Sequence, residues 1–399
     1  MKQTILILTL GLSACSPPSQ RRAAPATPSI TPSITSRLQL TEAEIRDLPS
    51  DLRHEIGADL HHYFRYISRR FVAVQCDLGA EGPVVNLHGD AHLEQYLVTT
   101  LGRGLGDFDE ATVGPVSIDL LRLATSIRIA SRARGWRAEA LWSAFLEGYV
   151  LSLEDPSTVA PEPSYVAREE SRFRHDHLRL LAECETLIQP VAETMSVSIE
   201  EGLQAYIASL QVRRPRVEAD WFDVVNVGRH EVGVASRAMT NFLIRVRGPT
   251  DAPEDDIVLE AKAVTSNPEA HCLPLSGRQD ALRVLLGEAR LAYTPFHLVG
   301  AVEIDGQPYW IHEWVDDYTE LRTESQDLTS PMMLEILFDI GVQLGAGHPR
   351  KMSADSSSLR QALRAFALRS GGAIWETSEE LAGEVRGAWR ELHAHPNPG

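Results

Sequence analysis

The chain has 399 residues, a net charge of −17, 43% apolar residues and 23% charged residues, a composition typical of folded globular proteins. This composition excludes disorder or a coiled coil for most of the length, and the acidic balance argues against nucleic acid or anionic lipid as the main partner, because such ligands favour clustered Lys and Arg. No apolar run reaches the ~18 residues of a membrane-spanning helix. The length suggests two or three domains, or one large enzyme with two lobes.

The first residues predict an export signal. Lys2 precedes a short apolar run over residues 4–14, which ends at Cys15, and this order is typical of a secretory signal peptide. The string LSAC resembles a bacterial lipobox, in which the Cys receives a diacylglycerol and the preceding peptide is removed. We therefore expect a signal peptide over residues 1–14, lipidation of Cys15 and a lipid-anchored protein of the cell envelope, on the outer membrane. An N-terminus that is merely apolar is the alternative.

Residues 15–37 predict a tether, because Pro, Ser, Thr and Ala dominate and no hydrophobic period is present. The folded part is expected to begin near Leu38. A helix over residues 41–70 should begin with a capping box formed by Thr41 and Glu44. A short buried strand, four helices and connecting loops then fill a helical lobe over residues 38–215; these elements are predicted at residues 83–87, 117–134, 136–153, 167–186 and 198–210.

The hydrophobic period changes after this lobe. Residues 216–325 predict a β-rich lobe, with β-branched or alternating strands followed by one helix and a hairpin around Asp305-Gly306, a strong turn signal. Its elements are predicted at residues 222–227, 238–246, 257–264, 277–292, 296–304 and 307–315. Residues 326–399 return to helix, so the sequence predicts an α+β protein with two lobes.

The segment over residues 86–95, NLHGDAHLEQ, is the first candidate for chemistry. Gly89 lets the backbone turn after a strand, so that the carboxylate of Asp90 can project into a cleft and orient a hydroxyl or a metal-bound water. A polar turn that caps the strand is the alternative.

A second acidic segment follows 17 residues after Asp90 and holds Asp107, Asp109 and Glu110 around one Phe. These carboxylates favour a divalent cation, with an exposed acidic turn as the alternative. Glycines at 102, 104 and 106 suggest a tight hairpin that brings Asp90 and Asp107 together. They do not form a dinucleotide fingerprint, because no suitable strand and helix surround them.

Two further candidates lie in the β-rich segment. The glycine-containing stretch over residues 228–236 would let backbone N–H groups approach phosphate oxygens, with an ordinary hairpin as the alternative. Lys262 lies in the middle of an apolar strand and is costly to bury without a partner; Glu288 is the expected partner, and a solvent-facing Lys on an edge strand is the alternative.

Three cysteines lie beyond the tether, at 76, 184 and 272, and they share no CxxC spacing, which argues against a zinc knuckle. An odd number permits one disulfide and a free thiol, or no disulfide. We expect buried, unpaired thiols.

Together these segments resemble protein-kinase-like phosphotransferases, in which an Asp accepts the substrate hydroxyl proton while an amide and a second Asp hold Mg²⁺ on the nucleotide phosphates. HGDAHLEQ looks like the loop of aminoglycoside and choline kinases. GDFDEATVGPVSIDLLRLATSI resembles the bacterial domain of unknown function 2252 (DUF2252), whose members pair GDAHLxN with an NDFDE segment and DLxRLAxS. This resemblance covers about residues 50–350 and implies a kinase-like fold in permuted order.

The resemblance also assigns roles to individual residues. Asp90 would be the catalytic base, Asp107 the metal carboxylate and Lys262 the contact to nucleotide phosphate, with Mg²⁺ and ATP or another nucleotide as the implied ligands. Asp119 would brace the catalytic loop, with Arg122 as its neighbour. The remaining assignments are His88 and His92 beside the base, Gln95 and Asp109 beside the metal, Gly233, Val234, Ala235 and Ser236 over the phosphates, Glu288 beside Lys262, and residues 313–315 near the hinge that holds adenine.

Three departures from the family pattern, together with the export signal, leave the function open. Gln95 stands in place of Asn, Ala235 and Ala263 replace a Gly and an acid, and the export signal directs the chain to a compartment without an ATP supply. The first expectation is a Mg-dependent phosphotransferase that acts on an unknown hydroxyl. A catalytically degenerate, ligand-binding lipoprotein is the second. A metal-dependent hydrolase is the third, because alternate residues of an extended HGDAH segment share a face; it would use His88, Asp90, His92, Asp107 and Asp109.

Overall fold

The computed structural model describes residues 33–213, 221–230, 240–250, 252–353 and 355–394. The description below concerns the compact unit Ile34–Gly399. Its helices are α1 (Ile34–Leu38), α2 (Glu42–Asp47), α3 (Ser50–Ala58), α4 (Leu60–Tyr66), α5 (Ser68–Asp77), α6 (Ser117–Arg134), α7 (Ala138–Glu154), α8 (Ser164–Glu170), α9 (His177–Leu187), α10 (Glu193–Arg213), α11 (Ala281–Leu291), α12 (Ser330–Gly347) and α13 (Ser356–Ala394).

The strands form three antiparallel sheets: β1–β4, β11–β2–β3 and a six-stranded sheet in the order β5–β6–β7–β8–β10–β9. Helices and strands together make an α+β fold, as the sequence predicts. The strands are β1 (Val84–Leu87), β2 (Tyr96–Thr99), β3 (Gly102–Leu105), β4 (Thr112–Pro115), β5 (Gln189–Pro190), β6 (Val224–His230), β7 (Asn241–Val246), β8 (Ile257–Ala263), β9 (Gly300–Ile304), β10 (Gln307–Glu313) and β11 (Tyr318–Glu320).

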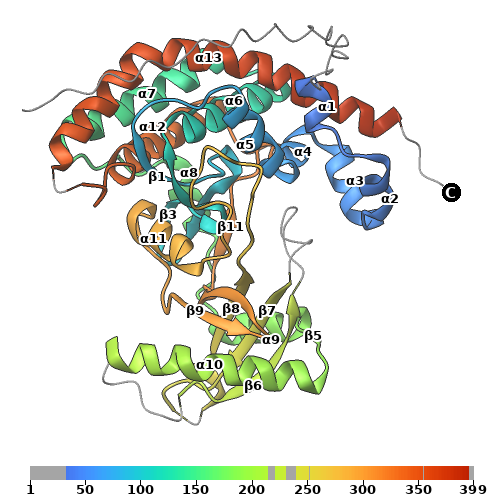
Figure 1. Ribbon diagram of the computed structural model, residues 1–399. Coiled ribbons are helices and arrows are strands. Elements are labelled where there is room, and N and C mark those ends of the chain that lie inside the picture. The colour runs from blue at the N-terminus through green and yellow to red at the C-terminus, as the bar shows by residue number, and fades with distance from the viewer. Residues whose placement is uncertain (1–32, 214–220, 231–239, 251, 354, 395–399) are drawn as a thin grey trace, which may run out of the picture. The chain divides into compact units, whose positions relative to one another are not determined.

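The largest hydrophobic core gathers α6, α7, α12 and α13, which lie together in Figure 1, with the helices that precede β1. α7 and α12 approach closely because glycines meet backbone at their contact. A Cβ added at Gly148 would lie 2.2 Å from the Phe338 carbonyl oxygen, and one added at Gly341 would lie 2.2 Å from that of Phe145. Only glycine therefore permits this helix spacing.

We expect Gly341→Ala to lower the free energy of unfolding by about 2 kcal/mol, because the added methyl group meets backbone rather than a movable side chain. Gly383 on α13 is the matched control, since a Cβ there meets nothing within 4 Å; Gly383→Ala should raise stability by about 0.5–1 kcal/mol through helix propensity. Urea unfolding of both variants measures the difference. Equal effects of the two substitutions would contradict the close helix contact.

The helix predicted over residues 41–70 is broken into α2, α3, α4 and the start of α5. Its first turn is as predicted, with the Thr41–Glu44 capping box present. Leu48 is extended and Pro49 is the N-cap of α3, because the residue before a proline disfavours the helical region. Asp59 is extended as well, and its side chain caps α4. Hydrophobic periodicity alone did not reveal these breaks.

The six-stranded sheet has a core of its own, formed with α10, the green helix beside the sheet in Figure 1. This packing differs from the expected boundary at residue 215, because α10 belongs with the sheet rather than with the helical core. α11, expected in the β-rich lobe, contributes Val284 and Leu291 to the helical core instead.

Alternation along the strands decides what lies on each face of this sheet. Leu259 and Ala261 of β8, and Tyr309 and Ile311 of β10, face the core with α10. Because successive side chains of a strand point to opposite faces, the even-numbered residues of β8 and β10 lie on the other face. The hairpin that joins β9 to β10 has positive φ at Asp305 and Gly306, as its sequence predicts.

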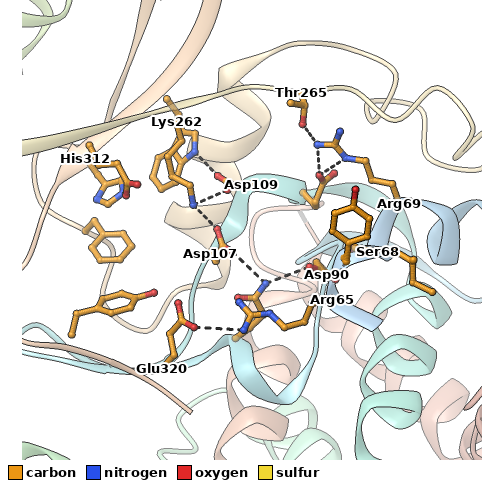
Figure 2. Close-up of a pocket in the computed structure, with 18 of the residues that line it drawn as sticks. Arg65, Ser68, Arg69, Asp90, Asp107, Asp109, Lys262, Thr265, His312 and Glu320 are labelled. Atoms are coloured by element: carbon orange, nitrogen blue, oxygen red, sulfur yellow. Dashed lines mark hydrogen bonds and ion pairs between the residues drawn. The ribbon is translucent and has the colours of Figure 1, made fainter. Parts of the chain in front are cut away.

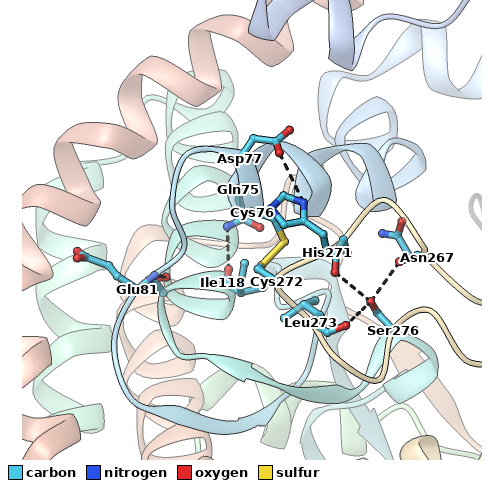
Figure 3. Close-up of a disulfide and its surroundings, with 12 residues drawn as sticks. Gln75, Cys76, Asp77, Glu81, Ile118, Asn267, His271, Cys272, Leu273 and Ser276 are labelled. Atoms are coloured by element: carbon cyan, nitrogen blue, oxygen red, sulfur yellow. Dashed lines mark hydrogen bonds and ion pairs between the residues drawn. A yellow bond between two sulfur atoms is a disulfide. The ribbon is translucent and has the colours of Figure 1, made fainter. Parts of the chain in front are cut away.

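The prediction of buried, unpaired cysteines is wrong for Cys76 and Cys272 and confirmed for Cys184. Cys76 at the end of α5 and Cys272 in the loop between β8 and α11 form a disulfide across 196 residues of sequence, as Figure 3 shows. Cys184 is a buried free thiol. The spacing of the cysteines could not reveal this pair, because the two residues come together only in the folded chain, where the loop after β8 packs against α5.

Within the described residues, no helix has the length and apolarity needed to cross a membrane.

Candidate functional site

A cavity of about 530 Å³ lies where α4, α5, the loops after β1 and β3, and the sheet face opposite α10 meet. It brings together several residues that the sequence singles out. Among its lining residues are Asp90, Gln95, Asp107, Asp109 and Lys262, although 172 positions separate the first and last of them. Figure 2 shows Asp90, Asp107, Asp109 and Lys262 around this space.

The antiparallel hairpin β2–β3 brings the two acidic loops together, as the glycines at 102, 104 and 106 suggest. Asp107, just after β3, adopts a left-handed conformation with φ of 55°. Such backbone is uncommon for a residue other than glycine, and strained positions are concentrated at functional sites.

One oxygen of Asp90 is held by the protein. Its Oδ1 accepts hydrogen bonds from the Ser68 hydroxyl at 2.7 Å and from Nε of Arg122 at 2.6 Å. Arg122 is fully buried, and its guanidinium also lies over the ring of Phe64. Burial raises the pKa of Asp90, against the opposing effects of Arg122 and Ser68. The second oxygen, Oδ2, lies 3.4 Å from Nε2 of Gln95.

The loop that carries Asp90 is fixed by Asp119, a fully buried residue of α6. The two carboxylate oxygens of Asp119 accept the backbone N–H groups of His88 and Gly89 at 2.7 and 2.9 Å. Gly89 has φ of +81°, and a Cβ there would lie 2.0 Å from the Glu110 carbonyl oxygen. The carboxylate and the glycine together fix the direction in which Asp90 projects.

Lys262 joins the two carboxylates of the second acidic loop. Its Nζ lies 2.7 Å from Asp107 Oδ1 and 2.7 Å from Asp109 Oδ2, and the Trp310 indole N–H donates to Asp109. β8 lies between β7 and β10, and the Lys262 side chain is 13% exposed. The alternative of a solvent-facing Lys on an edge strand is therefore wrong.

Burial and neighbouring charges shift the pKa values of Asp107 and Asp109 in opposite directions. Burial opposes ionisation of Asp107, but the Lys262 ammonium holds the pKa of Asp107 well below its usual range. Burial and the neighbouring Asp107 raise the pKa of Asp109 to about 7, despite the attraction of Lys262. One ammonium thus does not neutralise both carboxylates, and the pair favours a further proton or cation.

Gln95 lies between the two acidic loops. Its amide Nε2 is 3.4 Å from Asp90 Oδ2 and 3.5 Å from Asp107 Oδ2, and both contacts are long for hydrogen bonds. Rotating the amide by 180° places its oxygen where the nitrogen now lies. Three oxygen-bearing side chains therefore surround one space.

His88 and His92 are fully buried and do not line the cavity. His88 Nε2 bonds to the Gly106 carbonyl oxygen. Both ring nitrogens of His92 lack a hydrogen-bond partner, and burial holds its pKa well below the usual value. Both rings nevertheless lie against Asp90, since His88 Nδ1 accepts the Asp90 backbone N–H at 3.3 Å and His92 Nε2 lies 3.7 Å from Asp90 Oδ2. They pack beneath the loop, and their expected role beside the base stays a prediction.

Glu288 is not the partner of Lys262, which pairs with the aspartates instead. Glu288 Oε1 accepts the backbone N–H of Phe296 at 2.7 Å, while Oε2 is buried without a partner. Burial raises the pKa of Glu288 to about 7. The sequence places Glu288 on a helix that follows the strand of Lys262, but it could not show whether the Glu288 side chain faces Lys262.

We expect Glu288→Gln to change how stability depends on pH. Between about pH 4.5 and 7 the folded protein binds the Glu288 proton more tightly than the unfolded chain does, so this group makes stability fall as pH rises. The variant should match wild type near pH 4.5 and be more stable at pH 8, by up to about 3 kcal/mol. Urea unfolding at both pH values measures this effect.

Glu303→Gln is the control, because Glu303 is exposed on β9 and its replacement should shift stability equally at both pH values. A Glu288→Gln effect that does not depend on pH would contradict the burial argument.

The sequence did not point to several lining residues. Ser68 belongs to no recognisable motif, although its hydroxyl holds Asp90. Arg65 lines the cavity as well, and its guanidinium donates to the buried Glu94 at 3.2 Å. The aromatic side chains of β10 could have been predicted, because alternation along a strand places Trp310 and His312 on the same face of the sheet as Lys262.

A separate group of possible metal ligands lies outside this cavity, where His62, Glu94 and Glu324 bring one ligand atom each within 4.8 Å of one another. Glu94 already accepts from Thr323 and pairs with Arg65 and His61. This group therefore carries no argument for a metal.

The loop expected to cover phosphates, with Gly233, Val234, Ala235 and Ser236, lies outside the described residues, as does Cys15 of the expected lipid anchor.

Comparison with known proteins places the chain in one family. It matches the family described as "Uncharacterized protein conserved in bacteria (DUF2252)" over residues 55–163 and 158–395. No curated protein and no solved structure matches it. These matched segments contain all of the lining residues of the cavity except Leu40 and Glu44, and the chain belongs to the DUF2252 family.

Proposed function

We propose that the protein is a Mg²⁺-dependent phosphotransferase that moves a phosphoryl group from a nucleotide to a hydroxyl group. The convergence of Asp90, Asp107 and Lys262 on one cavity carries this proposal. Phosphoryl transfer relies mainly on positioning and electrostatic stabilisation, and the site offers a base, metal ligands and an ammonium side by side. A kinase-like fold in permuted order belongs to the same proposal.

In the proposed reaction, the acceptor oxygen forms a bond to the terminal phosphorus as the bond from that phosphorus to the bridging oxygen breaks, and a nucleoside diphosphate leaves. The hydroxyl proton passes to Asp90. Oδ1 of Asp90 is already occupied by Ser68 and Arg122, so Oδ2, on the side of Gln95, is the oxygen available to accept it. A raised pKa makes this carboxylate a stronger base than an ordinary Asp.

The residues present fit a Mg²⁺ ion. Asp90, Gln95 and Asp107 offer the hard oxygen ligands that Mg²⁺ prefers, and the neighbouring carboxylates of Asp107 and Asp109, which share one ammonium, favour an additional positive charge. Asp107 and Gln95 would hold the ion, with Asp109 beside it. A bound Mg²⁺ supplies charge neutralisation for the phosphates.

The charge around the cavity makes nucleotide binding depend on the cation. Seven acidic residues and four Lys or Arg residues line it, so a free polyphosphate would be repelled. Lys262 would contact the phosphates, as proposed from the family pattern. The acidic lining therefore favours the metal complex over the free nucleotide.

We also propose export to the cell envelope. The Cys76–Cys272 disulfide supports it, because such bonds form and persist in oxidising compartments and are rare in the cytosol. A donor other than ATP, or binding without turnover, would then be expected.

Calorimetry with Mg·ATP and Mg·GTP tests the proposed function, followed by an assay of phosphate transfer. We expect binding that requires Mg²⁺ and that Asp107→Asn weakens at least tenfold, whereas Glu303→Gln leaves it unchanged. No binding of either nucleotide would overturn the proposal. Binding without any turnover would favour the degenerate ligand-binding protein, and tight Zn²⁺ retention lost on His88→Ala or His92→Ala would favour the hydrolase.

A further inference from the structure

Three ring side chains, those of Phe296, Trp310 and His312, line one end of the cavity and are called the wall below. Trp310 and His312 of β10 lie directly opposite Lys262 and Glu260 of β8 in the strand register, and all four side chains line the cavity. Phe296 extends the wall. Figure 2 shows His312 on the same side of the space as Lys262.

The rings of this wall are stacked. His312 packs on Trp310 with centroids 4.5 Å apart and planes 26° apart, and on Phe296 with centroids 4.4 Å apart and planes 22° apart. Rings already ordered in this way offer a planar ligand a surface on which it can stack. Stacking on aromatic side chains accommodates every nucleobase, so the wall supplies affinity without choosing among bases.

A carboxylate lies beside the stacked rings. Glu260 Oε2 is 3.1 Å from Nε2 of His312, and His312 Nδ1 donates to the Glu313 carbonyl oxygen. Hydrogen bonding to His312 and the charge of Lys262 lower the pKa of Glu260 in spite of its burial. Glu260 is therefore an ionised acceptor in the cavity. Among the described residues, none donates to its other oxygen, Oε1.

The spacing of residues along β8 sets the distance between Glu260 and Lys262, the proposed phosphate contact. Residues 260 and 262 lie on one face of the strand and about 7 Å apart. A phosphate near Lys262 would leave room for a sugar before a ring reaches Glu260 and the wall. The sheet face thus has a cationic position and an anionic position for the two ends of one nucleotide.

We infer that the donor nucleotide carries guanine, and that Glu260 is the residue that selects it. This inference rests on the proposed function. Guanine presents two adjacent donors, N1–H and the 2-amino group, and a carboxylate accepts both. Adenine presents a lone pair at N1, which would face the negative charge, so that the same group rejects it. Glu260 is here a specificity-determining residue and takes no part in proton transfer.

Calorimetry with the Mg²⁺ complexes of GDP, IDP, ADP and CDP tests the inference on the full chain. We expect GDP to bind about 10–100-fold more tightly than ADP, which corresponds to one or two charge-assisted hydrogen bonds. IDP, which keeps N1–H but lacks the 2-amino group, should lie between them. Because this comparison uses the wild-type protein, it does not depend on whether a variant folds.

Glu260→Gln should remove most of the preference for GDP, because an amide can donate to adenine as readily as it accepts from guanine. Glu303→Gln is the matched control on the neighbouring part of the sheet; Glu303 does not line the cavity, and its substitution should keep the preference. ADP binding at least as tightly as GDP, or an unchanged preference in Glu260→Gln, would overturn the inference.

The outcomes also separate the inference from the proposed function. Equal binding of all four nucleotides that still requires Mg²⁺ and Asp107 would overturn guanine selection alone. Binding of none of them would overturn the phosphotransferase proposal, and guanine selection with it.

Discussion

Replacing both Cys76 and Cys272 with Ser should lower the free energy of unfolding by about 5 kcal/mol. The bond closes a loop across 196 residues, and in the loop-entropy model the stabilisation grows with loop length, reaching about 5 kcal/mol for a loop of this size. The disulfide also joins α5, whose first residues contact Asp90 and Glu110, to the loop after β8. Breaking it should therefore loosen the cavity as well as the fold.

Urea unfolding of the oxidised wild type and of the variants measures this effect. Each single variant should lose as much stability as the double variant, since either substitution breaks the same bond; this non-additivity separates the disulfide from local effects of Ser. Cys184→Ala is the control for loss of a buried thiol without a cross-link. Thiol titration of the unfolded protein should count two more free thiols after reduction than before it. A double variant as stable as wild type would contradict the cross-link.

The sequence predicts local features well, because each depends on neighbours along the chain. α6 begins and ends at the residues expected from its apolar pattern, and the capping box and the Asp305-Gly306 turn are present. The β2–β3 hairpin, suggested by glycines alone, is also present. In each case a few adjacent residues determine the backbone conformation.

Features that depend on distant parts of the chain could not be predicted in this way. The pairing of Cys76 with Cys272 and the placement of α10 on the sheet require knowledge of which surfaces meet. Lys262 illustrates this limit. Its need for a negative partner followed from the cost of burying a charge, but α11 and the loop after β3 both offered acids, and only the fold places Asp107 and Asp109 beside it.

The histidines of the HGDAH segment show a second limit. Alternation on an extended segment would place His88, Asp90 and His92 on one face. The chain instead turns at Gly89, so that Asp90 lines the cavity while both rings pack into the core. The turn at Gly89 thus keeps both rings out of the cavity lining, although His92 Nε2 stays 3.7 Å from Asp90 Oδ2.

Asp90→Asn should reduce phosphoryl transfer about 10²–10⁴-fold while Mg·nucleotide affinity changes only a few-fold. The amide keeps an oxygen for Ser68 and Arg122 but cannot accept the hydroxyl proton, and general-base catalysis contributes about 10²–10⁴-fold. Lys262 contacts Asp107 and Asp109 rather than Asp90, so the phosphate contact should persist. With water as the acceptor, release of phosphate from Mg·GTP and Mg·ATP measures turnover, and calorimetry measures affinity.

The same substitution leaves the buried Arg122 guanidinium without its carboxylate, and removing one partner of a buried ion pair costs about 3–5 kcal/mol of stability. Lost activity in Asp90→Asn could therefore arise from the fold. The double variant Asp90→Asn/Arg122→Met separates the two effects, because it removes both charges and replaces the guanidinium with an apolar side chain beside Phe64 and Phe71. We expect stability to return toward wild type while turnover stays low. Recovery of turnover together with stability would show that Asp90 serves the fold rather than the chemistry.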